Sequence, residues 1–158
     1  MFLDNGNPSF RTILLHLANT PPPTAGERPV ATIVHCTGGN NRTGVFIGLL
    51  LDILGVSPQD IGHEYALTDI GLADTLSAMQ KRLEARIIAT GLFSWDDGTI
   101  TQAGLDRMVS SRPENMVAMV RMLNEVWGGG ERYAKDFLGL SDDDIQRLRH
   151  NLTTEVES

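Results

Sequence analysis

Apolar residues recur along most of the chain with the three- and four-residue spacing of amphipathic helices. Proline and glycine residues separate the periodic stretches and set their approximate limits. Gly55 and Gly91 are expected to end two of them, and Gly128-Gly129-Gly130 interrupts the pattern near the C-terminal end. The pattern predicts helices over about 7–17, 42–54, 57–67, 70–88, 101–109, 113–127, 131–138 and 141–152.

Two of the predicted helices carry clear start signals. Ser57 precedes Pro58, which places an N-cap serine before a proline at the first helical position. Ser141 precedes three aspartates, whose negative charges complement the positive end of a helix dipole. The aspartate run is therefore interpreted as helix capping, because it lacks the alternating spacing of a calcium loop.

One apolar stretch has the character of a strand. Residues 29–34 are short, rich in β-branched side chains and bounded by Pro29, so a buried strand is predicted over about 29–35. The proline-rich segment 20–28 before it is expected to be an exposed loop, and 92–98 another loop. A single strand needs a partner. We expect it from Thr99-Ile100, from the N-terminal residues, or from sequence upstream of this chain.

Composition and charge indicate one globular domain. The chain has 158 residues and a formal net charge of −7, with no basic stripe that could follow nucleic-acid phosphates, so we expect no nucleic-acid partner. No apolar run reaches the roughly 18 residues of a membrane span, and no signal peptide is recognisable. Cys36, the one cysteine, cannot form an internal disulfide. A cytoplasmic location is therefore expected.

The stretch 35–44 (HCTGGNNRTG) lies between the predicted strand and a predicted helix. A small-residue loop leading into a helix N-terminus is suited to binding an anion. Cys36 and Arg42 stand at opposite ends of the loop, and the fork of the arginine can bind two phosphate oxygens. Near this cation and the helix N-terminus, the pKa of the thiol should be low, which favours nucleophilic attack.

The remaining loop residues have supporting roles in this hypothesis. Thr43 could donate its hydroxyl to the thiolate, and His35 is expected to orient the loop. Gly38, Gly39 and Gly44 permit tight or left-handed backbone positions. The histidines at 16, 63 and 150 show no paired spacing, so we expect neither a metal site nor an organic cofactor.

The sequence His-Cys-x5-Arg-Thr-Gly resembles the signature loop of the cysteine-dependent tyrosine and dual-specificity phosphatases. Three further stretches, 64–69, 112–116 and 137–145, resemble the microbial tyrosine/serine phosphatase family. The resemblance implies an α/β fold with an incomplete sheet, mostly helical here and lacking the family's N-terminal strands. It also implies that Cys36 is the nucleophile, Arg42 the phosphate clamp, and that substrate phosphate is bound by the loop residues Thr37, Gly38, Gly39, Asn40, Asn41 and Thr43.

The loop departs from the family pattern at one pair of positions. Asn40 and Asn41 stand where the family has Lys-Asp, so a cation and a carboxylate that could transfer protons are both absent. The general acid of related phosphatases has no counterpart in this chain. Asp4, Asp69 and Asp74 are the candidates, as carboxylates in relevant segments.

We therefore expect a phosphatase that hydrolyses phosphomonoesters, on phosphoproteins or small molecules, through a phospho-cysteine intermediate. Two alternatives follow from the altered loop: a pseudophosphatase that binds phosphate without turnover, and a loop used for another, biosynthetic reaction. If the predicted strand lacks neighbours, either a second copy or a partner chain is expected to cover the sheet edge.

Overall fold

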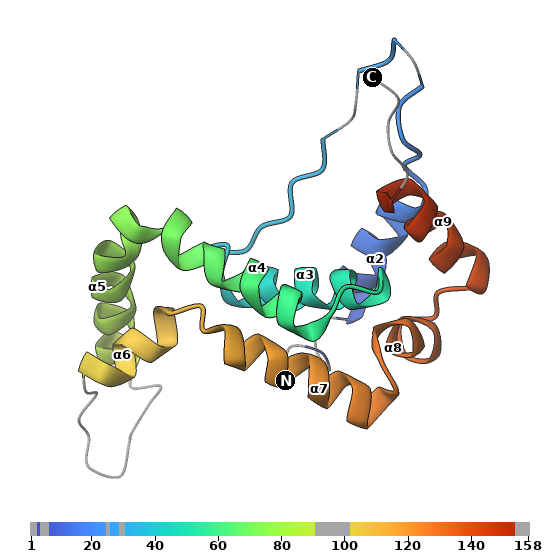
Figure 1. Ribbon diagram of the computed structural model, residues 1–158. Helices are drawn as coiled ribbons and strands as arrows, with labels where there is room; N and C mark the ends of the chain where they lie inside the picture. Colours follow the sequence, from blue (N-terminus) through green and yellow to red (C-terminus); the bar gives the residue numbers. More distant parts are fainter. Residues whose placement is uncertain (1–2, 4–6, 25, 29–30, 91–101, 154–158) are drawn as a thin grey trace.

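The computed structural model describes residues 3, 7–24, 26–28, 31–90 and 102–153 (Figure 1). All regular elements within these residues are helices. They are α2 (Asn7–Ala18), α3 (Asn41–Ile53), α4 (Pro58–Gly71), α5 (Ala73–Thr90), α6 (Gln102–Val109), α7 (Pro113–Trp127), α8 (Gly130–Asp136) and α9 (Asp142–Thr153).

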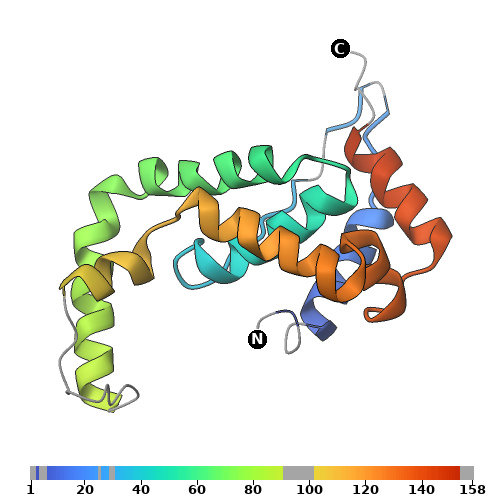
Figure 2. The ribbon, with the colours of Figure 1, turned by 60° about the horizontal axis from the view of Figure 1, so that its bottom comes forward.

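The helices are arranged around a central group of three. Helices α3, α4 and α7 pack against one another, α5 and α6 pair at one end of this group, and α2, α8 and α9 gather at the other (Figures 1 and 2). Helix α3 contacts both α4 and α8. The residues at its N-terminus are therefore held on a helix that is packed on several sides.

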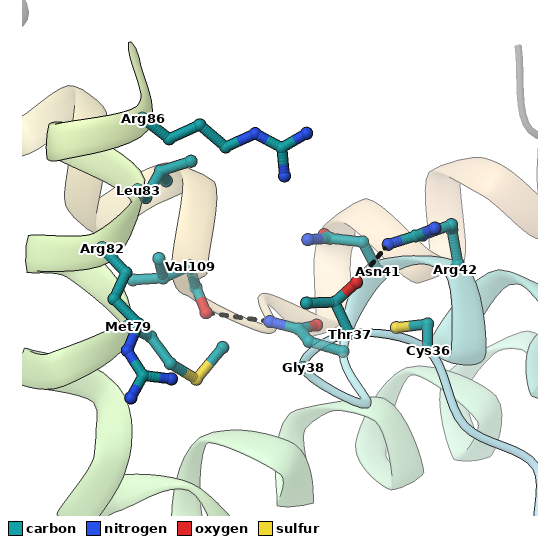
Figure 3. A pocket seen from close by; sticks show the side chains of 11 residues that line it. Cys36, Thr37, Gly38, Asn41, Arg42, Met79, Arg82, Leu83, Arg86 and Val109 are labelled. Atoms are coloured by element: carbon teal, nitrogen blue, oxygen red, sulfur yellow. Dashed lines mark hydrogen bonds between the residues drawn. The ribbon is translucent and has the colours of Figure 1, made fainter. Parts of the chain in front are cut away.

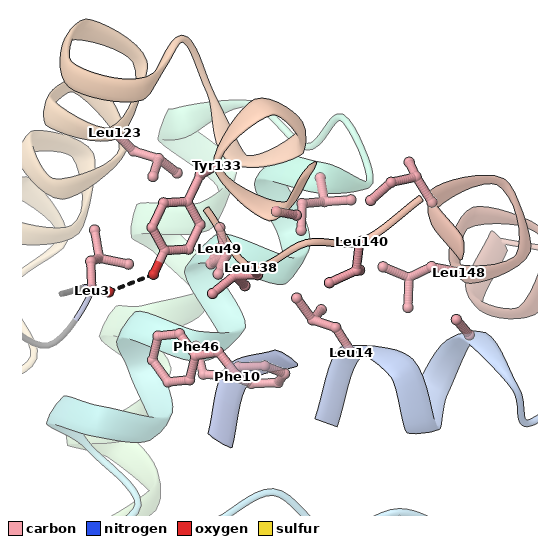
Figure 4. Packing of buried hydrophobic residues seen from close by; sticks show 14 residues of the cluster. Leu3, Phe10, Leu14, Phe46, Leu49, Leu123, Tyr133, Leu138, Leu140 and Leu148 are labelled. Carbon is pink, nitrogen blue, oxygen red and sulfur yellow. Dashed lines mark hydrogen bonds between the residues drawn. The ribbon is translucent and has the colours of Figure 1, made fainter. Parts of the chain in front are cut away.

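The main hydrophobic core lies where α2, α3, α8 and α9 meet (Figure 4). Its centre is aromatic, with Phe10 packed against Phe46 and Tyr133 fully buried beside them. The Tyr133 hydroxyl donates a hydrogen bond of 2.5 Å to the carbonyl of Leu3, so the buried phenol is satisfied. The other core residues are Leu14, Ala18, Leu49, Ile53, Leu123, Ala134, Leu138, Leu140, Ile145 and Leu148.

A second, smaller core joins α4 to α7 and consists of Ile61, Tyr65, Met116 and Val120. It lies directly beneath the start of α3, because a Cβ added at Gly44 would come within 2.5 Å of the Tyr65 ring. The absence of a side chain at Gly44 thus allows α3 and α4 to approach closely at the level of the cysteine loop.

Two predicted helix starts and one predicted helix end are confirmed, whereas the helix expected over 57–67 continues to Gly71. Ser57 Oγ accepts the backbone N–H of Asp60 at 3.2 Å, and Ser141 Oγ accepts that of Asp144 at 3.1 Å. Gly128 ends α7 in the left-handed region, with φ of 77°. Local sequence signals therefore identify these helix ends correctly.

The strand predicted over 29–35 is wrong for residues 31–35, which are extended but belong to no sheet. The physical reason is that the described residues offer no second strand with which their backbone groups could pair. Ile33 is 83% exposed rather than buried. The described part is thus helical, and an α/β sheet is not seen in it. Residues 29–30 and the expected partner Thr99-Ile100 lie outside the described residues.

Two apolar side chains within the predicted helices 70–88 and 141–152 are exposed rather than buried. Ile70 is 75% exposed, because α4 continues to Gly71 and Ile70 belongs to its last turn rather than to the next helix. Leu152 is 41% exposed in the last turn of α9. The proline-rich segment is irregular and largely exposed in its described residues, as predicted, and the loop expected over 92–98 lies outside the described part. No described helix is long and apolar enough to cross a membrane.

We expect Gly44→Ala to destabilise the protein by about 1–2 kcal/mol, because the new methyl group overlaps the buried Tyr65 ring and overpacking outweighs the gain in helix propensity. Gly71→Ala is the matched control, since its Cβ would meet no atom within 4 Å. Urea denaturation monitored by circular dichroism measures both. Equal midpoints for the two variants would contradict the close approach of α3 and α4.

Candidate active site

The loop from Cys36 to Asn40 connects the extended segment to the N-terminus of α3 and forms one wall of a cavity of about 340 Å³ (Figure 3). Helix α5 forms the opposite wall. The cavity is lined by Cys36, Thr37, Gly38, Asn40, Asn41, Arg42, Met79, Arg82, Leu83, Arg86 and Val109. Six residues of the stretch predicted to bind phosphate therefore line one cavity.

The Cys36 thiol is partly buried, which by itself raises its pKa. The nearby Thr43 hydroxyl and backbone N–H, and the backbone N–H groups of Gly38 and Gly39, stabilise the thiolate enough to outweigh this effect and lower the pKa of Cys36 to about 6. At neutral pH the side chain is therefore mainly a thiolate, as the sequence predicted. The sequence suggested that the Arg42 cation would lower the pKa of Cys36. The pKa is lowered instead by the neighbouring hydroxyl and backbone N–H donors.

The Thr43 hydroxyl is buried, and no group in the described part of the chain gives it a hydrogen bond of ordinary geometry. It nevertheless lies near enough to Cys36 to act on the pKa of the thiol. A buried donor without an acceptor costs free energy. An ionised sulfur would provide that acceptor, so the two groups stabilise each other in the thiolate form.

Arg42 projects from the first turn of α3, and its Nη2 donates to Thr37 Oγ1 at 2.7 Å (Figure 3). Both side chains are exposed. The guanidinium is thus held over the loop by a neighbour within the loop while its remaining N–H groups stay available to an oxyanion.

The side chain of Asn40 is buried and hydrogen-bonded within the protein, so it is not available to a ligand. It is 2% exposed, its Nδ2 donates to the carbonyl of Val109 at 2.9 Å, and its Oδ1 accepts the Ser111 hydroxyl at 3.0 Å. Although Asn40 is the N-cap residue of α3, its side chain makes no capping bond. The side chain ties the loop to the segment before α7, which leaves only its backbone for substrate.

The other predicted loop residues occupy distinct positions. Gly39 has φ of 70°, so a left-handed residue is required there, as expected. Gly38 instead approaches the Met79 side chain. Asn41 is exposed at the first position of α3, and exposed His35 places Nδ1 3.2 Å from the Cys36 carbonyl, which fits an orienting role.

Of the three candidates for a general acid, the two that the structure describes do not line the cavity. Asp69 accepts the backbone N–H of Ser111 at 2.7 Å, and its negative charge helps to keep Tyr65 neutral by adding to the raised pKa that burial gives this phenol. Asp74 lies in the first turn of α5 and does not line the cavity. Asp4 lies outside the described residues. No carboxylate is among the described residues that line the cavity.

Sequence reasoning missed the residues that α5 contributes. Met79, Arg82, Leu83 and Arg86 share one face of this helix and line the cavity. Their three- and four-residue spacing was visible and indicated an amphipathic face. Nothing in the sequence indicated that this face would lie opposite the cysteine loop.

Comparison with known proteins identifies related sequences. The model of a tyrosine phosphatase family matches residues 1–154. The chain belongs to this tyrosine phosphatase family. A tyrosine-protein phosphatase from Nostoc commune is 29% identical over 151 residues, which cover 96% of this chain and 46% of the relative. The triple specificity protein phosphatase PtpB of Mycobacterium tuberculosis is 26% identical over 126 residues, which cover 79% of this chain and 44% of the relative.

The chain thus spans about half the length of the curated phosphatases that it matches. The family assignment confirms the resemblance noted in the sequence. Among the described residues, no group of three or more histidine, cysteine or carboxylate side chains could hold a metal ion.

We expect alkylation of Cys36 by iodoacetamide to follow a titration with a midpoint near pH 6, because only the thiolate reacts and its fraction rises with pH. The rate should fall about tenfold per pH unit below the midpoint and level off above pH 7. Mass spectrometry reads the reaction without ambiguity, since Cys36 is the only cysteine.

Thr43→Val should move this midpoint upward, since the hydroxyl that stabilises the thiolate is removed. The urea-unfolded chain is the reference and should titrate as an ordinary thiol, near pH 8.5. A native midpoint equal to that of the unfolded chain would contradict the role assigned to the loop.

Proposed function

We propose that this chain hydrolyses phosphomonoesters through covalent catalysis by Cys36. The thiolate attacks phosphorus, the Sγ–P bond forms, and the bond from phosphorus to the ester oxygen breaks with its electron pair remaining on that oxygen. Water then attacks the phospho-cysteine, releasing inorganic phosphate and restoring the thiolate. The leaving oxygen and the released phosphate exchange protons with solvent.

The observation that carries this proposal is that Cys36 and Arg42, at the two ends of one loop, line the same cavity. The low pKa of Cys36 supports it. A nucleophile and an oxyanion clamp face one cavity, and the first turn of α3 adds backbone N–H groups to it. We propose that the phosphate is bound by Thr37, Gly38, Gly39, Asn41 and Thr43. Asn40 would contribute only its backbone.

The cavity favours aryl over alkyl phosphates. Without a carboxylate in its described lining, the leaving oxygen departs with little help from a general acid. The tyrosine phenol has a pKa near 10, so its phenolate is a far better leaving group than the more basic alkoxide of serine or threonine. We therefore propose phosphotyrosine rather than phosphoserine as the preferred substrate. The expected cytoplasmic location stays a prediction.

We expect Cys36→Ser to lower kcat on para-nitrophenyl phosphate by about 10³-fold or more, because a serine hydroxyl is not ionised at neutral pH. Arg42→Lys should lower kcat/KM by about 10–100-fold, since the charge remains but the two-pronged contact with phosphate is lost. Circular dichroism controls for folding. Undiminished turnover in Cys36→Ser would refute the mechanism.

A binding module that recognises phosphate without turnover is the second candidate. It is favoured by Asn40-Asn41 in place of a charged pair and by the lack of a carboxylate in the described lining. Such a protein would bind a phosphotyrosyl peptide in a calorimeter and leave it intact.

Asn41→Asp separates these candidates. We expect it to raise kcat by about tenfold or more, because Asn41 lines the cavity and a carboxylate there can accept the proton of the attacking water. Its negative charge should also raise KM. Asn115→Asp, exposed in the first turn of α7 and outside the cavity, is the control. An unchanged kcat would show that proton transfer at position 41 does not limit the reaction.

A further inference from the structure

The cavity beside Cys36 holds more positive charge than one phosphate group requires. Arg42 from the loop and Arg82 and Arg86 from α5 all line it. Its described lining contains no acidic side chain, in a chain whose formal net charge is −7. The cavity is therefore a local cationic site on an acidic protein.

The two α5 arginines are separate from the phosphate loop. They are four residues apart, so they lie on the same helix face about one turn from each other. Figure 3 shows Arg86 extending from this wall towards the loop while Arg82 lies beside Met79. Arg42 and the loop already provide the donors for one phosphate group, so Arg82 and Arg86 are placed to bind a second anion.

The space between the two cationic walls is apolar. Met79 and Leu83 from α5 and Val109 from the end of α6 line it. A flat apolar body with an anion at each end would match this lining, and an aromatic ring fits between flexible and branched apolar side chains. The cavity volume of about 340 Å³ is within the range of small-ligand sites.

We propose that Arg82 and Arg86 select phosphotyrosyl peptides that carry an acidic residue next to the phosphotyrosine. This inference rests on the proposed function of the loop. The phosphate binds the loop and Arg42, the tyrosine ring lies against Met79, Leu83 and Val109, and the neighbouring carboxylate pairs with the α5 guanidinium groups. Because both α5 arginines are exposed, the pairs contribute a preference rather than an absolute requirement.

Binding to the Cys36→Ser chain tests the preference without turnover. The probes are two fluorescein-labelled phosphotyrosyl peptides of the same length, one with glutamate and one with glutamine on each side of the phosphotyrosine. We expect the glutamate peptide to bind about 5–20-fold more tightly at low salt, and the difference to shrink at 0.5 M salt. Arg82→Gln/Arg86→Gln should remove the difference and leave the affinity of the glutamine peptide within about twofold.

Lys81→Gln is the matched control. Lys81 is exposed, adjoins Arg82 in sequence and does not line the cavity, so Lys81→Gln removes one positive charge from the same helix but none from the cavity. The preference should persist in this variant. Equal affinities for the two peptides in the Cys36→Ser chain, a preference that survives the double arginine change, or an equal loss in Lys81→Gln would each overturn the proposal. Tighter binding of a soluble inositol polyphosphate than of the acidic peptide would overturn the assignment to peptides.

Turnover of the same unlabelled peptides by the chain with Cys36 intact distinguishes the two proposals. A preference in binding that depends on Arg82 and Arg86, together with no release of phosphate, would refute hydrolysis and support the recognition site. Release of phosphate at equal kcat/KM from both peptides would support hydrolysis and refute the role of α5.

Discussion

The buried side chain of Asn40 is the contact on which the geometry of the cysteine loop depends. By bonding Val109 and Ser111, it connects the start of α3 to residues about seventy positions later in the chain. Ser111 is held in turn by Asp69 of α4. The loop is thus fixed at the point where three helices meet, and the side chain used for this purpose cannot cap α3. The first-turn N–H groups of α3 consequently remain available to the sulfur and to an oxyanion.

Local patterns predicted most of the helices because these helices carry their own start signals and apolar faces. The Ser57-Pro58 and Ser141 caps formed as predicted, and Met116, Val120 and Leu123 are buried in α7. The loop chemistry was also local, since Cys36, Thr43 and the glycines lie within nine residues of one another. A thiol among several short-range N–H donors needs no distant residue to become acidic.

Features that depend on distant contacts could not be predicted from the sequence. The strand over 29–35 required a neighbouring strand, and apolar character alone does not supply one. Asn40 was expected to bind substrate phosphate with the rest of the loop, and only the fold shows that its side-chain amide joins two chain segments instead. In the sequence, Arg82 and Arg86 are two charged residues of an amphipathic helix. Only the packing of α5 shows that they lie opposite the loop.

The two ends of α3 differ in their electrostatic environment. Arg149 donates two hydrogen bonds to the carbonyl of Ile53, which places a cation at the negative end of the helix dipole. The positive end has no acidic side chain in its first turn, whereas α4, α5, α7 and α8 each have one and α9 has three. A bound phosphate would therefore complete the charge pairing of α3. Because it would pair with the folded helix only, phosphate should raise the melting temperature of the whole protein in proportion to the logarithm of its concentration.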